Sequence, residues 1–376
     1  MNFSVSSATL LTHLQAISRV INSKNTLPIL DNFLFNLHDG VLTITAADME
    51  TTMTTNVTLN SSEGSGLVAL SAKILMDTLK EFSDEPLNFD INDSNYMMKI
   101  TSVANNGKYE FIGQNADEFP KMRDLDEGSS RIAIPANVLN MGITATAFAT
   151  SESETHPIMG GIYFDITTEN ITFVATDGRK LVRIKSTAAK GDSNTSFVLP
   201  KKPIALLKAI LPKEAGDVEV TFDSKNVCFK MSDYQLVCRL IEGNYPNYNA
   251  VIPTNNPKKA VIERTALLNA LRRVAVYASQ STNLVKIDFE NNQLTCSAQD
   301  FDFSISAEES LSCSYEGEPI KIGFKCSIMI DMLNNLNSDN VAMEMSDPAR
   351  AGLLLPLEQS ETEDVLMLLM PMQLAD

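Results

Sequence analysis

The acidic residues with the spacing most suggestive of chemistry are two short pairs, Asp48 with Glu50 and Asp300 with Asp302. Carboxylates two residues apart could bind Mg²⁺, as a metal-dependent nuclease would require. Two-residue motifs are weak signals, and both pairs lie where a predicted strand ends, which favours ordinary turn acids. Asp177 occupies the same place in a third segment, and a residue that recurs in every copy of a repeat is better explained by structure than by catalysis. We therefore predict no catalytic residue and no metal site, and a nuclease remains only an alternative.

Other catalytic and cofactor signatures are missing from the sequence. His156 lies in a polar segment with no Cys or Ser partner at a recognisable spacing. Neither G-x-x-x-x-G-K-[ST] nor G-x-G-x-x-G occurs, so phosphate-loop and dinucleotide sites lack their motif and no cofactor is predicted.

The cysteines and the N-terminus indicate the compartment. The five cysteines are an odd number without a C-x-x-C pair, which predicts reduced and mostly buried thiols. The N-terminus has no basic stretch followed by an apolar run, and no window approaches the ~20 apolar residues of a membrane span. We expect a cytoplasmic protein without membrane association.

The charge of the chain is unevenly distributed. Thirty basic and 47 acidic residues give a net charge of −17, which argues against a simple basic nucleic-acid binder. Six helices are predicted, at 8–24, 72–82, 136–150, 201–213, 265–279 and 325–336. They contain eleven basic residues and only three acidic ones. Glu favours helices as much as Lys and Arg do, so its scarcity there indicates a positive surface that contacts a polyanion through its phosphates.

The helices flank a hairpin that occurs three times. Residues 32–48, 161–177 and 284–300 align without a gap, at offsets of 129 and 123 residues. Each copy alternates apolar and polar residues on both sides of a polar turn, which predicts a β-hairpin. A helical pattern precedes each hairpin, and a further strand and helix follow it.

The repeat divides the chain into three domains. A fainter echo links residues 5–11 to residues 69–75, where in both cases a strand ends at Ser-Ala and a serine can cap the following helix. We therefore predict an α+β protein with domains at 1–126, 127–255 and 256–376, each built from two strand–helix–strands units.

The C-terminal tail is apolar and rich in methionine. Its strand pattern should stop at Met370, because Pro371 has no N–H to donate to a neighbouring strand. Methionine suits adaptable peptide-binding surfaces, but Met-rich tails also simply pack into a core. The residues alone leave both interpretations open.

Several motifs, taken together and in order, resemble one family. They are F-x-V-x-x-x-x-L-L at the start, T-L-P-I-L (26–30), A-T-D-G-x-x-L (175–181), N-Y-P-N-Y (244–248) and M-P-M-x-L (370–374). The chain resembles, over its whole length, the bacterial DNA polymerase sliding clamps, the β subunits of DNA polymerase III.

The resemblance implies a head-to-tail homodimer that forms a ring, with helices lining the hole and sheets outside. Such a ring encircles duplex DNA without reading its sequence, and it is associated with the nucleoid during replication. It makes the polymerase processive and is not itself an enzyme. The implied partners bind through a short apolar peptide: the catalytic subunit of DNA polymerase III, the clamp loader, other polymerases and repair proteins. A protein-only scaffold that never contacts nucleic acid is a second alternative.

The resemblance also implies site residues. The partner-peptide groove corresponds to Met159, Thr176, Gly178, Arg179, Lys180, Leu181, Pro246, Val251, Met370, Pro371, Met372 and Leu374. DNA-facing positions correspond to Lys24, Lys73, Lys201 and Lys202, with the loop at 150–157. The subunit interface corresponds to Lys108, Tyr109 and Phe111 in the first domain and to Val276 and Tyr277 in the third.

The sequence departs from the family pattern at several groove positions. Gln373 stands where many members have Arg, Arg179 where some have His, and Ala250 where others have a basic residue. Ala375 and Asp376 extend past the usual terminal Leu. These differences concern the polar contacts of the groove and not its apolar floor.

One expectation about the interface comes from the residues themselves. A strand at 107–114 places Tyr109 and Phe111 on one face, which is too apolar for an edge exposed to water. Lys99 and Lys108 lie on or beside this strand, whereas Asp300, Asp302, Glu308 and Glu309 lie in the segment 300–309. Opposite charges around an apolar pair would fix the register of a head-to-tail contact.

Overall fold

The computed structural model describes the whole chain except residues 103, 105, 122–124, 127, 375 and 376. The α-helices of the described residues are α1 (Ser7–Ser18), α2 (Ala72–Lys80), α3 (Ala136–Thr146), α4 (Lys201–Ile210), α5 (Arg264–Ala275) and α6 (Cys326–Asn334). Short 3₁₀ helices are η1 (Pro28–Asp31), η2 (Ala116–Glu118), η3 (Ala147–Ala149), η4 (Pro157–Gly160), η5 (Leu211–Lys213) and η6 (Tyr248–Val251).

Each predicted helix is present, but most are shorter than predicted. The first ends at Ser18 rather than at residue 24, so Arg19 caps it and Lys24 lies in the loop that follows. Residues 22–25 are Asn, Ser, Lys and Asn, three of which favour local side-chain hydrogen bonds over continued helix. The Asn25 amide, for example, donates to the carboxylate of Asp31 at 2.7 Å.

The chain forms two compact units. The first comprises Met1–Asn137 and Lys202–Leu240, and the second comprises Val138–Lys201 and Ile241–Asp376. Residues 127–255, predicted as the middle domain, contribute strands to both units. In each unit those strands continue a sheet that begins in a neighbouring repeat.

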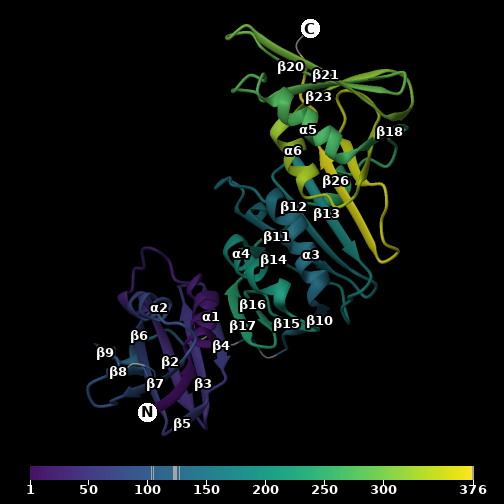
Figure 1. Ribbon diagram of the computed structural model, residues 1–376. Helices are drawn as coiled ribbons and strands as arrows, with labels where there is room; N and C mark the ends of the chain where they lie inside the picture. Colours follow the sequence, from purple (N-terminus) through teal and green to yellow (C-terminus); the bar gives the residue numbers. More distant parts are fainter. Residues whose placement is uncertain (103, 105, 122–124, 127, 375–376) are drawn as a thin grey trace. The chain divides into compact units, whose positions relative to one another are not determined.

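The first unit contains two antiparallel sheets (Figure 1). Its five-stranded sheet has the order β5 (Ser61–Glu63), β1 (Asn2–Ser6), β7 (Pro86–Ile91), β8 (Met97–Ser102), β9 (Lys108–Ile112). Its eight-stranded sheet has the order β10 (Ser130–Pro135), β15 (Asp217–Phe222), β16 (Asn226–Lys230), β17 (Tyr234–Arg239), β4 (Thr51–Val57), β3 (Val41–Ala47), β2 (Asn32–His38), β6 (Gly66–Ser71). Helices α1 and α2 pack against each other.

The second unit repeats this plan with a longer sheet. Its nine-stranded sheet has the order β14 (Thr195–Pro200), β11 (Gly161–Ile166), β12 (Ile171–Thr176), β13 (Lys180–Ser186), β26 (Glu363–Leu369), β25 (Gly352–Pro356), β24 (Asn340–Met345), β18 (Lys258–Glu263), β22 (Ser314–Glu316). Its four-stranded sheet has the order β21 (Ile305–Ser312), β20 (Gln293–Asp300), β19 (Leu284–Glu290), β23 (Ile320–Lys325). Helices α5 and α6 pack against each other.

The three predicted hairpins are confirmed, and they share one register. Phe35 pairs with Ile44 in the first copy, Phe164 with Phe173 in the second, and Ile287 with Cys296 in the third. All six side chains are completely buried. The alternation seen in the sequence therefore marks the core face of each sheet.

The helix starts also follow from local sequence. Ser71 caps α2, its hydroxyl accepting a hydrogen bond from the amide of Ile74 at 3.4 Å. In α1 the cap lies one residue earlier than the sequence echo implies, because Ser6 accepts from Thr9 at 3.1 Å. Ser7 is turned inward instead, and its hydroxyl donates to the carbonyl of Ser83 at 2.8 Å.

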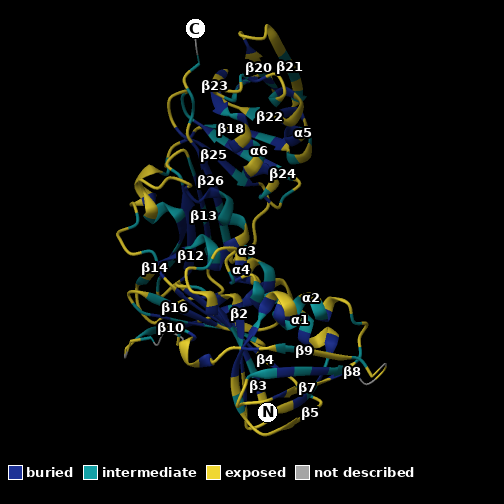
Figure 2. Ribbon diagram, turned by 90° about the vertical axis from the view of Figure 1, so that its left-hand side faces the viewer, coloured by how far each residue is buried: buried dark blue, intermediate teal, exposed yellow. Residues whose placement is uncertain are grey.

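In the second unit, strand β12 is buried along its whole length, as Figure 2 shows. All five cysteines are free, and only Cys313 is not buried. Burial raises the pKa of Cys296 to about 12 and that of Cys326 to about 11. The prediction of reduced and mostly buried thiols is confirmed. Among the described residues, no helix combines the length and the apolar character needed to cross a membrane.

Candidate functional site

The hairpin of β12 and β13 and the end of β26 lie side by side in the second unit. Strand β13 pairs antiparallel with β26, from Lys180 opposite Leu369 to Ser186 opposite Glu363. The amide of Met370 then donates to the carbonyl of Arg179 at 2.9 Å. Gly178 has φ +84°, a conformation that side chains other than glycine rarely adopt, so glycine is needed for the turn. The turn and the first tail residue are thereby held together.

The turn is stabilised by Asp177. Its Oδ1 accepts hydrogen bonds from the amides of Arg179 and Lys180 at 2.8 and 2.9 Å, and its Oδ2 pairs with the Lys180 ammonium at 3.0 Å. Burial alone would raise the pKa of this carboxyl, but the hydrogen bonds and the charge of Lys180 lower it below its ordinary value.

The equivalent aspartates make the same turn contacts in the other repeats. The Oδ1 of Asp48 accepts from the amides of Glu50 and Thr51 at 2.8 and 2.6 Å. The Oδ1 of Asp300 accepts from the amides of Asp302 and Phe303 at 2.9 and 3.2 Å. The predicted structural role of the repeated aspartate is confirmed.

An apolar cluster lies beside the turn, and we call it the groove cluster. Its buried members are Val174, Leu181, Tyr248, Ala351, Leu353, Leu366 and Leu368, with Tyr163, Tyr245, Ile252 and Leu355 packed against them. The Tyr245 ring stacks on Tyr163 with ring centroids 4.5 Å apart and an angle of 3° between the planes. The Tyr248 hydroxyl donates to the carboxylate of Asp165 at 2.7 Å. These contacts fix the segment 245–252 on the sheet.

The sequence-based groove residues lie in different parts of this region. Leu181 belongs to the groove cluster, whereas Pro246 and Val251 are exposed, the latter by 55%. Thr176 is 8% exposed, and its hydroxyl donates to the carbonyl of Lys180 at 2.7 Å. Met159 lies in η4, where its carbonyl accepts from the amide of Ser151 at 2.8 Å.

Sequence reasoning missed several members of the groove cluster, notably Tyr163, Leu353 and Leu368. Leu353 and Leu368 lie in continuous apolar runs of β25 and β26, and Tyr163 lies on the face of β11 opposite the alternating Ile162, Phe164 and Ile166. Strand periodicity was the available signal. It could not show which face of these strands meets the turn.

The tail continues from this region to the other sheet of the unit. Strand β26 ends at Leu369, as predicted, and Met370 is 42% exposed. Pro371 cannot donate, and pairing resumes for one residue where the amide of Met372 donates to the carbonyl of Gly323 at 2.8 Å. A Cβ on Gly323 would lie within 2.9 Å of the Met372 carbonyl oxygen and of the side chains of Leu374 and Leu284. Only glycine at position 323 therefore lets the tail approach β23 so closely.

A cavity of about 340 Å³ opens where the tail leaves the turn. It is lined by Arg179, Ser281, Thr282, Lys325, Ile328, Met370, Pro371 and Met372. Of the predicted groove residues, Arg179 and Met370–Met372 line this cavity, while Leu374 lines a different one.

The predicted DNA-facing lysines differ in their surroundings. Lys24 and Lys73 are exposed, and neither makes an ion pair within the described part of the chain. The ammonium of Lys201 pairs with Glu152, whose side chain is 91% exposed. Lys202 is instead held by three oxygens at 2.5 Å, the carbonyl of Val20, the amide oxygen of Asn22 and the carboxylate of Asp48.

The helices keep the predicted excess of positive charge in their observed bounds. They hold eight basic residues and two acidic ones. The number of basic residues differs from the predicted eleven because the observed helices exclude Arg19, Lys24, Lys213 and Lys325 and include Arg264.

The predicted interface residues lie at sheet edges and a helix end. Strand β9 is the edge of the five-stranded sheet, and β21 is the edge of the four-stranded sheet (Figure 1). Tyr109 is 39% exposed and packs edge-on against Phe82 at 5.3 Å between ring centroids, while Ile112 is 67% exposed. Val276 and Tyr277, after α5, are 73% and 41% exposed.

Some of the charged residues proposed to flank the interface have oppositely charged neighbours within the same chain. Lys99 lies opposite Glu110 in the pairing of β8 with β9. Glu309 forms an ion pair with Arg273, which lowers the pKa of its carboxyl. Glu308, on the outer face of β21, is exposed.

Comparison with known families gives one consistent result over almost the whole chain. Residues 1–123, 133–247 and 249–373 match the N-terminal, central and C-terminal domains of the DNA polymerase III beta subunit. The beta sliding clamp of Synechococcus elongatus is 29% identical over 372 residues, covering 96% of each chain. That of Haemophilus influenzae is 26% identical over 374 residues, covering all of both chains.

Solved structures agree. The DNA polymerase III subunit beta of Pseudomonas aeruginosa superimposes with a TM-score of 0.93 at 23% identity, covering all of both chains, which establishes the fold. A sliding clamp of Bartonella birtlesii, solved bound to griselimycin, gives a TM-score of 0.91 at 27% identity with the same coverage.

Proposed function

Because the chain belongs to the DNA polymerase III beta subunit family, the bacterial sliding clamps, we propose that two copies close around duplex DNA and tether partner proteins through the groove cluster. A sliding clamp is a non-catalytic processivity factor, and DNA, a polymerase and a second copy are its family partners. The proposal names the residues that contact each of these partners.

The observation that carries the proposed groove is an apolar cluster with an open border. Leu181, Leu366 and Leu368 form its buried floor, and Val251 and Met370 stand exposed on it or beside it. The cavity of about 340 Å³ adjoins this border. A large apolar side chain buried there would gain ~1.5–3 kcal/mol before ordering costs, which suits micromolar and exchangeable binding.

The groove is tested by removing its tail. Deletion of residues 370–376 should abolish binding of an apolar peptide taken from a polymerase, because the deletion removes Met370–Met372 from the cavity. Fluorescence anisotropy measures the peptide, and sedimentation velocity shows whether the dimer persists. Unchanged peptide affinity in the truncated protein would place the groove elsewhere.

Lys24 and Lys73 are the best-supported DNA contacts, since both ammonium groups are exposed and unpaired within the described residues. Contacts to phosphates release counterions, so their loss should weaken DNA binding and reduce its dependence on salt. Lys24→Glu with Lys73→Glu should lower retention on nicked circular DNA at low salt while sparing peptide binding. Retention equal to that of the unaltered protein would remove these two lysines from the DNA surface.

The proposed dimer joins the edge strand β9 of one copy to the third repeat of the other. Exposed Tyr109 and Ile112 on one side, and Val276 and Tyr277 on the other, are apolar groups that a partner would bury. Val276→Glu together with Tyr277→Glu should produce monomers in sedimentation velocity. A dimer that survives both changes would point to a different interface.

Family membership argues against both alternatives raised by the sequence, a nuclease and a protein-only scaffold. In both Asp48 and Asp300, one carboxylate oxygen accepts hydrogen bonds from backbone amides of the same turn, which favours a structural role over metal binding. Within the described residues, no three His, Cys, Asp or Glu side chains form a metal-binding group. A clamp loaded by its loader should stay on closed circles and slide off linear DNA, which neither alternative would do.

A further inference from the structure

The cavity of about 340 Å³ beside the tail contains two cations and, among its described lining residues, no acid. The cations are Arg179 and Lys325, and the hydroxyl side chains of Ser281 and Thr282 line the same cavity. Neither cationic side chain forms an ion pair or a hydrogen bond in the described part of the chain. In a protein with a net charge of −17, two unpaired cations at one cavity form a local positive site.

The tail lies between these two cations. On one side, the amide of Met370 donates to the carbonyl of Arg179 at 2.9 Å. On the other side, Met372 forms an antiparallel bridge with Gly323. Two residues further along both segments, this antiparallel direction places Met370 beside Lys325. Arg179 and Lys325 are therefore separated by about two strand spacings, roughly 10 Å, and their long side chains can reach one small anion between them.

Helix α6 adds to the positive potential of the cavity. Lys325 is its N-cap residue, and Ile328 in its first turn also lines the cavity. The amides of Cys326 and Ser327 already donate to Asn283. The helix therefore contributes through the positive end of its dipole, which favours an anion nearby, and not through these two amides.

The cavity lies a short distance from the groove cluster on two paired strands. Leu181 of β13 and Leu368 of β26 are buried members of the cluster and lie opposite each other. Arg179 precedes Leu181 by two residues, and Met370 follows Leu368 by two residues. Two residues of strand span ~7 Å, so an extended peptide anchored on the cluster reaches the cavity with about two or three further residues.

We propose that this cavity selects partner peptides that carry an Asp or Glu about two or three residues from the apolar anchor, with Arg179 and Lys325 binding the carboxylate. Its volume is at the lower end of the ~300–1,000 Å³ of ligand sites, which suits a single side chain. Ile328 and Met370–Met372 provide an apolar lining for the methylene groups of that side chain. The selection rests on the proposed peptide groove and names the chemistry of the residue that flanks the anchor.

The test compares synthetic peptides on the full-length protein by fluorescence anisotropy. All share a Leu-Phe anchor and carry either Glu or Gln about two or three residues before or after it. Gln keeps the shape of Glu without its charge. At low salt the better Glu peptide should bind roughly five- to tenfold more tightly than its Gln counterpart, and high salt should shrink the difference.

The protein variants separate the cavity from a general effect of charge. Arg179→Gln combined with Lys325→Gln should bring the ratio of the Glu and Gln affinities to about one, whatever the affinity of the anchor itself becomes.

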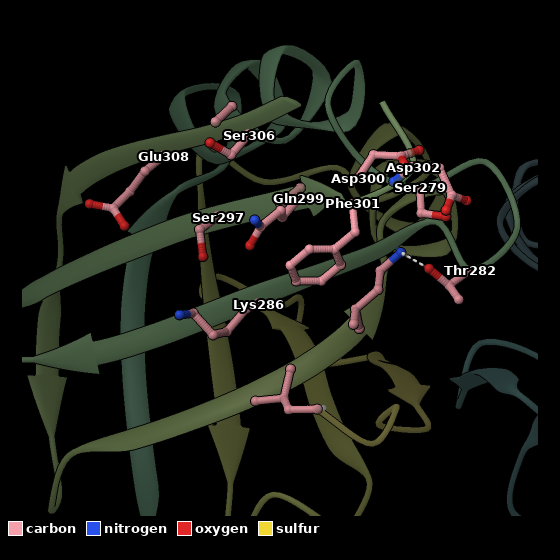
Figure 3. Close-up of a pocket in the computed structure, with 14 residues that line it drawn as sticks. Ser279, Thr282, Lys286, Ser297, Gln299, Asp300, Phe301, Asp302, Ser306 and Glu308 are labelled. Carbon is pink, nitrogen blue, oxygen red and sulfur yellow. Dashed lines mark hydrogen bonds between the residues drawn. The ribbon is translucent and has the colours of Figure 1, made fainter. Parts of the chain in front are cut away.

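Lys286→Gln is the matched control. Lys286 lies on β19, which pairs with β23, and it lines a larger cavity of about 670 Å³ beside Phe301 (Figure 3) but not the smaller one. This variant removes one positive charge from the same sheet, and it should keep the preference for Glu.

The possible failures are distinguishable. If the peptides bind but Glu and Gln versions bind equally, the selection is refuted and the groove stands. A preference that persists in the Arg179→Gln, Lys325→Gln variant, or that Lys286→Gln abolishes as fully, also refutes it. If a short DNA duplex displaces the Glu peptide as well as unlabelled peptide does, the two cations bind phosphate and the proposal fails. If no peptide binds, the groove itself fails, and the selection with it.

Discussion

The contact of Lys202 with Asp48 predicts that this lysine stabilises the fold. The Lys202 ammonium is held by three oxygens, and Asp48 is 9% exposed. The substitution Lys202→Met removes the ammonium group. The nearly buried carboxylate of Asp48 then has no cation, and the loop after α1 loses its contacts with Lys202. The methionine keeps the length and apolar stem of the lysine, so the loss is that of the charge and its hydrogen bonds.

The size of the effect follows from burial. Removing one partner of a fully buried ion pair costs ~3–5 kcal/mol. The Lys202 side chain is 30% exposed, so water replaces part of the interaction, and we expect a loss of about 2–4 kcal/mol. For a folding unit of this size, that lowers the melting temperature by roughly 4–16 °C.

The neighbouring lysine is the control. Lys201 pairs with Glu152, whose side chain is 91% exposed, and such surface pairs contribute only ~0–1 kcal/mol. Differential scanning calorimetry of Lys202→Met, Lys201→Met and the unaltered protein measures both effects, and amide exchange at Val20 and Asn22 reports on the loop. If the two variants melt within a degree of each other, the contact does not stabilise the fold.

Three further predictions test the second unit, the thiols and the response to pH. Tyr248→Phe removes the hydroxyl that donates to Asp165, so it should lower the free energy of unfolding by ~1–2 kcal/mol and weaken peptide binding, as urea titration and anisotropy will show. A thiol reagent should modify Cys313 first in the native protein and all five cysteines in urea, and fast reaction of two or more native thiols would contradict the described burial. Burial lowers the pKa of His13 although Asp233 opposes it, so the unfolded chain takes up the proton first and stability should fall as pH drops below ~6.5. The urea midpoint of His13→Gln should fall less between pH 7.5 and 5.5, and equal falls would exclude His13 as the cause.

Local sequence determined the repeated hairpins and the helices that flank them. Alternation with period two requires a strand with one buried face, and the three copies confirm it with Phe35, Phe164 and Ile287 at one register position. The repeated aspartate was predictable for the same reason, because it serves the turn of its own hairpin. Helix ends were less predictable, since weak side-chain hydrogen bonds at residues 22–25 decide where α1 stops.

Sequence reasoning located part of the groove through a resemblance and through the apolar tail. It identified Leu181 and Met370, which lie in short motifs, and Val251, which follows one of them closely. It missed Tyr163 and Leu368, because a buried strand residue looks the same whether it faces a groove or a sealed core.

Contacts between distant segments were decided only by the tertiary structure. In the sequence, Lys202 is one of many basic residues in predicted helices. Only the fold brings it into contact with Asp48, which lies 154 positions away. The bridge from Met372 to Gly323 and the cavity beside Phe301 likewise join segments whose spacing carries no signal. Periodicity records which face of an element is buried, whereas the partner on that face depends on how the sheets pack, and this is fixed by the chain as a whole.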